Sequence, residues 1–95
     1  MTVSFYFLAA LKKNDAERFA EYQIKTRDIV SALDVELLAV TENFEVLEGE
    51  LEATNLVLLR FPDEAEFRKY WDDPAYRAVV PLREQSAVTN FALTF

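Results

Sequence analysis

The stretch from Leu56 to Arg83 is the feature of this sequence that most constrains its fold. It opens with four consecutive apolar residues, 56–59, which is typical of a strand covered on both faces. Pro62 has no N–H to give to a sheet and ends the strand. Asp63, with Glu66 three residues later, then has the spacing of a capping box at the start of a helix. The stretch therefore predicts a central strand followed directly by a helix.

The second half of this stretch predicts two short helical segments. Phe67 and Tyr70 have the apolar spacing of a short helix. Asp73 then has the place of a second cap, with Pro74 at the first helical position, where its missing N–H costs nothing. Pro81 is expected to break or kink the second helix and to push the residue before it toward an extended conformation.

The rest of the chain predicts further elements around this unit. From their apolar periodicity they are a strand at 3–11, a helix capped by Asn14, a strand at 35–41 and a final strand at 88–95. The apolar face of the helix also carries two polar residues, Gln23 and Thr26. The strands at 35–41 and from residue 56 are expected to pair as a hairpin with an elaborated end.

The predicted order is strand, helix, strand, strand, helix, strand. This order is typical of the ferredoxin-like α+β fold, a βαββαβ arrangement with an antiparallel four-stranded sheet and both helical segments on one face. A chain of 95 residues is expected to form a single domain of this kind, over residues 1–95.

One face of such a sheet needs a cover that the predicted elements do not supply. The first and third strands are apolar on both faces, and 52% of the residues are apolar. Leaving about four to six large side chains in water would cost roughly 1.5–3 kcal/mol each, a total that rivals the stability of a small domain. We therefore expect a homodimer through the sheet face, a dimeric α/β barrel.

Composition excludes several kinds of site. The sequence has no His, no Cys and a single glycine, Gly49. Thiolate and imidazole metal sites, Cys or Ser–His nucleophiles and glycine-rich phosphate loops are therefore excluded. A carboxylate site for Mg²⁺ or Ca²⁺ would still be open, but the sequence has no calcium-loop motif. We expect no metal and no cofactor.

The net charge of −7 argues against two classes of partner, nucleic acids and anionic membrane surfaces. The sequence has no run of about 18 apolar residues that would predict a spanning helix. Its first residues lack a basic leader, so no signal peptide is expected. The cytoplasm is the default location.

Three short motifs, in this order and spacing, resemble a known family. They are Val46-Leu47-Glu48-Gly49, Phe61-Pro62 at the end of a strand, and Trp71-Asp72-Asp73-Pro74-Ala75-Tyr76 at the restart of a helix. Over nearly its whole length the chain is similar to the family called domain of unknown function 1330. The resemblance implies a small dimeric α/β barrel, in which a ferredoxin-like protomer packs its sheet on its twin. Related barrels include cofactor-free monooxygenases, isomerases and haem-degrading enzymes, and the lack of His disfavours the last.

The chain departs from the family pattern in one loop. The family usually has a Gly-Gly pair before the second strand, where this chain has Ser31-Ala32-Leu33-Asp34. Without those glycines the first helix is expected to end with another C-cap, at Asp34.

Three residues are candidates for chemistry. Glu48, beside the glycine turn, would act as a general base if it were partly buried; otherwise it is a solvated turn acid. Arg83 would bind an anionic ligand bidentately, or pair with Glu84, Asp72 or a carboxylate of the twin. In an enzyme, Arg83 or Tyr76 would steady an enolate or a carboxylate.

Aromatic residues are the candidates for ligand binding. Tyr70 and Trp71, with Tyr76, would form an aromatic wall, although their helical spacing favours packing in the core or at the dimer interface. Tyr6, on the first strand, is the third expected ligand contact. Their cavity is expected between the sheet and the helices or at the barrel mouth.

Two functions remain open. The first is a small dimeric α/β-barrel protein that binds a small molecule. The alternative is a cofactor-independent enzyme, monooxygenase-like or isomerase-like, with Glu48 as its carboxylate base. The enzyme requires Glu48, Tyr76 and Arg83 to converge on one concave site.

Overall fold

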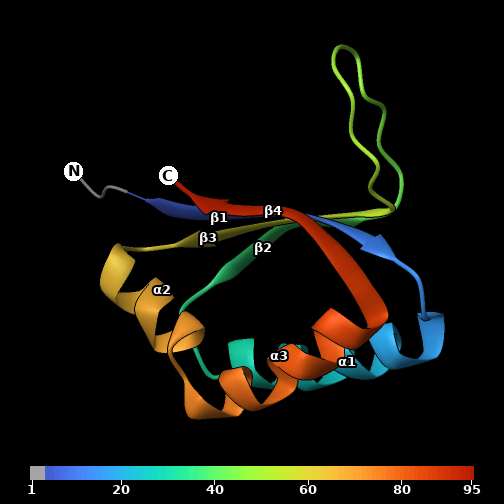
Figure 1. The fold of residues 1–95 in the computed structure, drawn as a ribbon. Helices are drawn as coiled ribbons and strands as arrows, with labels where there is room; N and C mark the ends of the chain where they lie inside the picture. The colour runs from blue at the N-terminus through green and yellow to red at the C-terminus, as the bar shows by residue number, and fades with distance from the viewer. Residues whose placement is uncertain (1–3) are drawn as a thin grey trace.

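The computed structural model describes residues 4–95, which form a two-layer α+β fold of four strands and three helices (Figure 1). In chain order the elements are β1 (Phe5–Lys13), α1 (Ala16–Val30), β2 (Glu36–Thr41), β3 (Asn55–Phe61), α2 (Glu64–Trp71), α3 (Pro74–Ser86) and β4 (Ala87–Thr94). The predicted ferredoxin-like order is confirmed, and the second helical segment is divided into α2 and α3. Val3, expected in the first strand, lies outside the described residues.

The sheet is antiparallel throughout, in the order β2-β3-β1-β4. The central strands β1 and β3 pair in unbroken register from Phe5 to Leu11 of β1. The two edge strands each carry an irregularity: β2 shifts register between Leu37 and Ala39, and β4 shifts where it passes Ala10 and Leu11. The pairing of β2 with β3 confirms the predicted hairpin.

The N-terminus of α1 lies one residue beyond the predicted cap. The cap is Asp15, whose carboxylate accepts the backbone N–H of Arg18 at 3.2 Å. Asn14 instead donates its backbone N–H to the carbonyl of Ser86, at the end of α3. Asn and Asp are equally good caps, so the sequence alone does not choose between them.

Asp63 caps α2 as predicted, since its carboxylate accepts the N–H of Glu66 at 2.8 Å. The carboxylate of Glu66 does not complete the capping box. It accepts the N–H of Asp34 at 2.9 Å, in the connection between α1 and β2. Asp34 is therefore not the C-cap of α1, which is Ser31. The bond to Glu66 ties α2 to the far end of α1.

α3 begins as predicted and continues where a break was expected. Asp73 caps the helix and Pro74 occupies its first turn. The helix runs through Pro81 to Ser86, so the expected break, with Val80 extended, is wrong. A proline inside a helix withholds one hydrogen bond, and the burial of Tyr76 and Val80 from the same helix offsets that cost.

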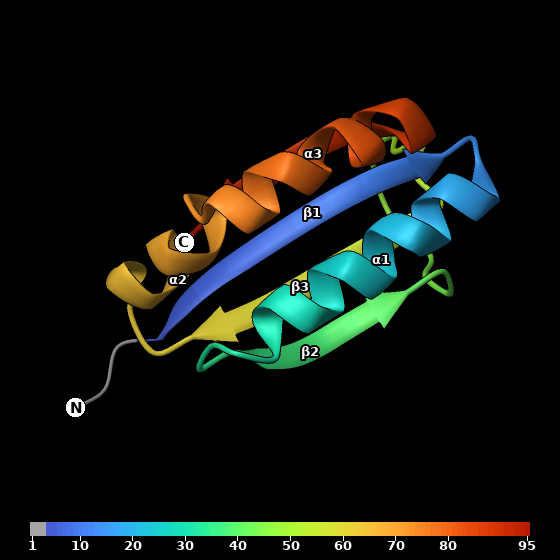
Figure 2. The same cartoon turned by 90° about the horizontal axis from the view of Figure 1, so that it is seen from below.

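The helices lie together on one side of the sheet (Figures 1 and 2). The core between the layers is aromatic: Phe7 and Phe61 from the sheet meet Phe67 and Tyr70 from α2. The rings of Phe61 and Phe67 are T-shaped, with centroids 5.4 Å apart, a favourable geometry for an aromatic pair. These contacts fix α2 on the sheet.

No helix of residues 4–95 covers the opposite face of the sheet (Figure 1), and several large apolar side chains lie on it. Leu8 pairs with both Leu58 and Leu93, which places these three side chains on that face. Beside them Tyr6 stacks on Phe95, with ring centroids 5.1 Å apart. Leu93 is 44% exposed and Phe95 62% exposed. We call this surface the open face.

Candidate functional site

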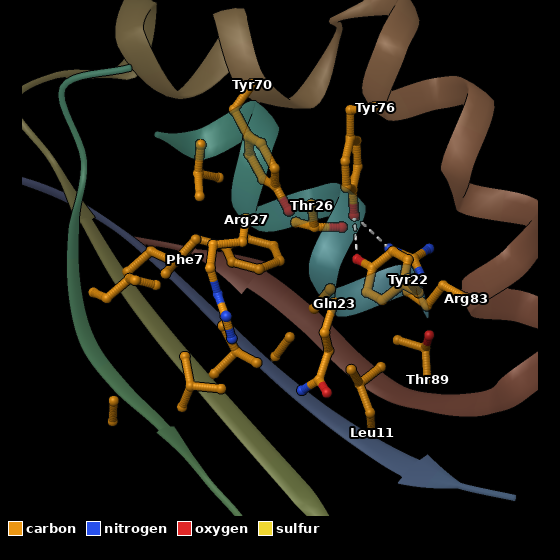
Figure 3. A pocket seen from close by; sticks show the side chains of 18 of the residues that line it. Phe7, Leu11, Tyr22, Gln23, Thr26, Arg27, Tyr70, Tyr76, Arg83 and Thr89 are labelled. Atoms are coloured by element: carbon orange, nitrogen blue, oxygen red, sulfur yellow. Dashed lines mark hydrogen bonds between the residues drawn. The ribbon is translucent and has the colours of Figure 1, made fainter. Parts of the chain in front are cut away.

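A cavity of about 330 Å³ lies between the helices and the sheet (Figure 3). Most of its lining is apolar, and the polar lining residues are Tyr22, Gln23, Thr26, Arg27, Tyr70, Tyr76, Arg83 and Thr89. Ala9 of β1 and Ala92 of β4 pair across the sheet and both line the cavity. Small side chains at this pair leave space that larger residues would fill.

Two tyrosines and an arginine meet at one end of the cavity (Figure 3). The hydroxyl oxygens of Tyr22 on α1 and Tyr76 on α3 are 2.9 Å apart, and Arg83 donates Nη1 to the Tyr76 hydroxyl at 2.9 Å. Tyr76 and Arg83 are two helical turns apart and share one face of α3. The helices α1 and α3 pack against each other, which brings Tyr22 to the same point (Figure 2).

Tyr22 and Tyr70 are neutral and Arg83 is charged at neutral pH. Burial, followed by the neighbouring Tyr76, raises the pKa of Tyr22 and the pKa of Tyr70. Burial alone would lower the pKa of Arg83, but the Tyr76 and Tyr22 hydroxyls outweigh this effect and the pKa is raised. The end of the cavity therefore presents neutral phenol groups beside a cation.

The two arginines that line the cavity have no acidic partner in residues 4–95. The ion pairs of this part of the chain use all four lysines together with Arg18, Arg60 and Arg68. Of the other arginines, Arg77 covers Trp71, with its guanidinium carbon 4.6 Å from the indole ring centroid. Arg27 and Arg83 line the cavity, and no Asp or Glu of residues 4–95 does. The cavity is therefore basic in a chain whose net charge is −7.

Of the predicted site residues, Tyr70, Tyr76 and Arg83 come together in the cavity. The rings of Tyr70 and Tyr76 are in contact, with centroids 4.4 Å apart. Trp71 packs beside them, with its ring 5.8 Å from that of Tyr76, and is not part of the lining. Arg83 bonds to Tyr76, and the ion pairs of residues 4–95 do not include the expected partners Glu84 and Asp72.

Glu48 and Tyr6 lie on the other side of the sheet. Glu48 is exposed in the connection between β2 and β3, residues 42–54, which projects away from the helices (Figure 1). Tyr6 belongs to the open face, where it stacks on Phe95. Within one chain, Glu48 therefore does not converge with Tyr76 and Arg83.

The contribution of α1 to the cavity is only partly visible in the sequence. Apolar periodicity places Gln23 and Thr26 on the sheet-facing side of this helix. Polar residues on that side indicate a polar site between the helix and the sheet. The same periodicity places Ala16 and Ala20 on the sheet-facing side and Tyr22 outside it. In the structure Ala16 and Ala20 are exposed. The helix turns Tyr22 inward instead, to 7% exposure.

The acidic residues do not gather into a metal site. In the described range, 4–95, there is no group of three or more that is suited to hold an ion. In the same range no helix is long and apolar enough to cross a membrane.

Solved structures show the same fold at low sequence identity. A protein of unknown function from Rhodopseudomonas palustris, RPA0582, superposes with a TM-score of 0.74 at 18% identity, over 100% of this chain and 81% of that one. A dimeric ferredoxin-like protein of unknown function from Jannaschia sp. CCS1 gives a TM-score of 0.76 at 16% identity, over 98% and 96%. SnoaB from Streptomyces nogalater, a cofactor-independent oxygenase, gives 0.71 at 11% identity, over 97% and 90%.

The sequence comparisons identify the family. No curated protein matches the chain. The family model described as "Domain of unknown function (DUF1330)" matches residues 4–94, which is nearly the whole chain. This match agrees with the motifs around Glu48, Pro62 and Pro74. The chain belongs to the DUF1330 family.

Proposed function

We propose that this protein is a homodimer that binds a small molecule in the cavity between its helices and its sheet. The observation that carries the proposal is the cluster of Tyr22, Tyr76 and Arg83 at one end of an otherwise apolar cavity. Small-molecule sites are typically about 300–1,000 Å³, mostly apolar, with a few convergent polar groups. The cavity of about 330 Å³ fits this description at its lower end.

The homodimer is proposed to form through the open face. Two solved structures of this fold, including the Jannaschia protein, are described as dimeric ferredoxin-like proteins. On this chain the open face leaves Val88, Leu93 and Phe95 more than 40% exposed. A second sheet packed on these residues would remove their apolar surface from water, which is the main favourable contribution to most protein–protein association.

Residues 42–54 support the same arrangement. This connection projects from the open-face side of the sheet (Figure 1). It carries Leu47, which is 84% exposed, and Val46, which is 41% exposed. In the proposed dimer this connection, the arm, lies along the partner subunit and buries these two side chains.

A cavity-filling variant tests the binding site. Compounds from a set of small aromatic and carboxylic molecules are expected to raise the melting temperature and to shift the NMR signals of residues 22–27 and 76–83. Ala92→Leu, which places a larger side chain against the cavity, should weaken this binding, whereas Ala20→Leu on the exposed side of α1 should not. Binders that perturb only other surfaces, or that bind Ala92→Leu as tightly as wild type, would contradict the proposal.

The alternative is a cofactor-independent enzyme, favoured by the fold shared with SnoaB. In it, Tyr76 and Arg83 steady an enolate or a carboxylate. Because Glu48 lies across its own sheet, a base at this position would come from the arm of the partner subunit (Figure 1). Glu48→Gln should then abolish turnover while leaving the melting temperature unchanged. A variant that keeps full turnover would remove Glu48 from this alternative.

A further inference from the structure

We infer that the ligand of this cavity is a small organic anion, a carboxylate on an apolar body, with its charge beside Arg83. This inference rests on the proposed binding function and names the class of ligand. It is carried by three features of the cavity: its charge, its hydrogen-bond donors and its walls.

The charge of the cavity is uncompensated by the described chain. Arg83 is partly buried and has no acidic partner in residues 4–95. Arg27 also lines the cavity without an acidic partner, but it is exposed, so the cost of desolvation falls on Arg83. Taking a cation out of water is costly unless it is paired. The chain has 17 acidic residues, and every lysine forms an ion pair with a carboxylate. The arginines at the cavity therefore do not lack partners because acidic residues are scarce. An anionic ligand would supply the missing partner.

The polar end also has more donors than acceptors. A guanidinium has five N–H groups, and Arg83 uses Nη1 on Tyr76, while its buried Nε has no partner in residues 4–95. The Tyr22 and Tyr76 hydroxyls share one hydrogen bond, in which either is the donor. Whichever donates, the other phenol keeps its proton free for an outside acceptor. A carboxylate, which only accepts, matches this set.

The remaining walls select an apolar body. Phe7, Leu11 and Phe19 line the cavity with Val57 and Leu59. A polar group of the ligand placed against these side chains would lose its hydrogen bonds to water and form none with the protein. A planar aromatic or short branched carboxylate, with its carboxylate at Arg83 and its body toward the sheet, therefore fits better than a sugar or a dianionic phosphate.

Matched acids and amides test the inference on the intact protein. Benzoate, phenylacetate and cinnamate would be titrated beside their primary amides, with binding read by NMR and calorimetry. Since a hydrogen bond to a charged group is worth about 1.5–3 kcal/mol, each acid that binds should bind about tenfold or more tightly than its amide. Arg83→Met should weaken the binding of the acids far more than the binding of the amides, and so remove most of that difference.

Two further variants keep the result interpretable. Arg68→Met removes the same charge at an exposed pair with Glu64, away from the cavity, and should leave the preference for acids intact. Tyr76→Phe keeps Arg83 but removes a hydroxyl beside it, and should reduce the preference for acids relative to wild type, which provides a second reading if Arg83→Met does not fold. Amides that bind in the cavity as tightly as acids would overturn the inference and leave the binding proposal standing. Neither class binding in the cavity would overturn both.

Discussion

At the scale of single residues, Tyr76 joins the two helices that flank the cavity. Its side chain is fully buried, and its hydroxyl contacts both the Tyr22 hydroxyl and Arg83 Nη1. A buried hydroxyl that satisfies two neighbours at once is costly to remove, because both neighbours lose a partner. The polar end of the cavity is therefore also a structural contact between α1 and α3.

Tyr76→Phe should lower the free energy of unfolding by about 1–3 kcal/mol, because it leaves buried polar groups unpaired while keeping the ring. Urea unfolding would measure the change. Tyr22→Phe, which removes one of the two contacts, is the matched control and should cost less. A loss in Tyr22→Phe that equals or exceeds the loss in Tyr76→Phe would show that Arg83 does not depend on Tyr76.

Glu66 should make the fold sensitive to acid. The N–H of Asp34, followed by the Lys69 ammonium, lowers the pKa of Glu66 from its usual 4.5. Because the folded pKa lies below the unfolded one, the carboxylate stabilises the fold above the unfolded pKa, and this contribution is lost as the pH falls through the folded pKa. In Glu66→Gln the unfolding free energy should therefore fall less between neutral and acid pH than in wild type.

Glu64→Gln is the control for this pH dependence, since Glu64 makes only an exposed ion pair with Arg68 at 3.9 Å. Its acid profile should follow that of wild type. If Glu66→Gln also follows wild type, the bond between Glu66 and Asp34 does not contribute to stability in solution.

Residue roles are predictable where they depend on neighbours along the chain. The caps Asp63 and Asp73 are confirmed because capping is set within one helical turn. Tyr76 and Arg83 share one face of α3 only because the helix continues through Pro81, which the local proline signal does not predict. The place of Glu48 is not predictable in this way, because the direction in which a connection leaves a sheet is set by the strands on either side of it.

At the scale of elements, α3 shows that tertiary packing overrides a local signal. Pro81 is exposed, but Tyr76 and Val80 beside it are buried against the rest of the core. The helix continues through the proline because leaving it would expose these side chains. The sequence rule that a proline ends a helix considers the backbone alone, and so it fails here.

Pro81→Ala should stabilise the protein by about 2 kcal/mol. Alanine is favoured over proline by about 3 kcal/mol inside a helix. The unfolded chain is more flexible with alanine than with proline, which reduces this gain by about 0.4–1 kcal/mol. Thermal or urea unfolding would measure the gain. Pro74→Ala is the control, because a proline in the first helical turn withholds no bond, and it should give no gain. A destabilised Pro81→Ala would mean that the proline ring itself contributes to packing.

At the scale of the whole molecule, the order and pairing of the strands are predictable from the sequence, whereas most of the cavity lining is not. The order of elements leaves few ways to build one sheet, and the structure adopts the expected one. The cavity depends on side chains from several elements meeting over the small residues Ala9 and Ala92. Such packing across the fold leaves no pattern along the chain. The exceptions are Gln23 and Thr26, whose polar side chains interrupt the predicted apolar face of α1.

Charge on the open face should prevent the proposed dimer. Wild-type protein is expected to sediment as a dimer at micromolar concentration, and Leu93→Asp as a monomer of 11.0 kDa. Ile24→Asp is the control, because Ile24 is 59% exposed on α1, away from the open face, and this variant should remain dimeric. A monomeric wild type, or a dimeric Leu93→Asp, would rule out an interface at this face.

The register shifts in β2 and β4 bear on how far association can go. Both strands are sheet edges, and a straight edge is a template on which further chains can add strands without limit, as in fibrils. An extra residue in each edge strand interrupts the regular hydrogen-bonding ladder at that border. Lateral growth is thereby discouraged at both borders, while the proposed stacking through the open face is complete after two copies. The register shifts in the two edge strands therefore disfavour polymerisation of a chain that exposes many apolar side chains.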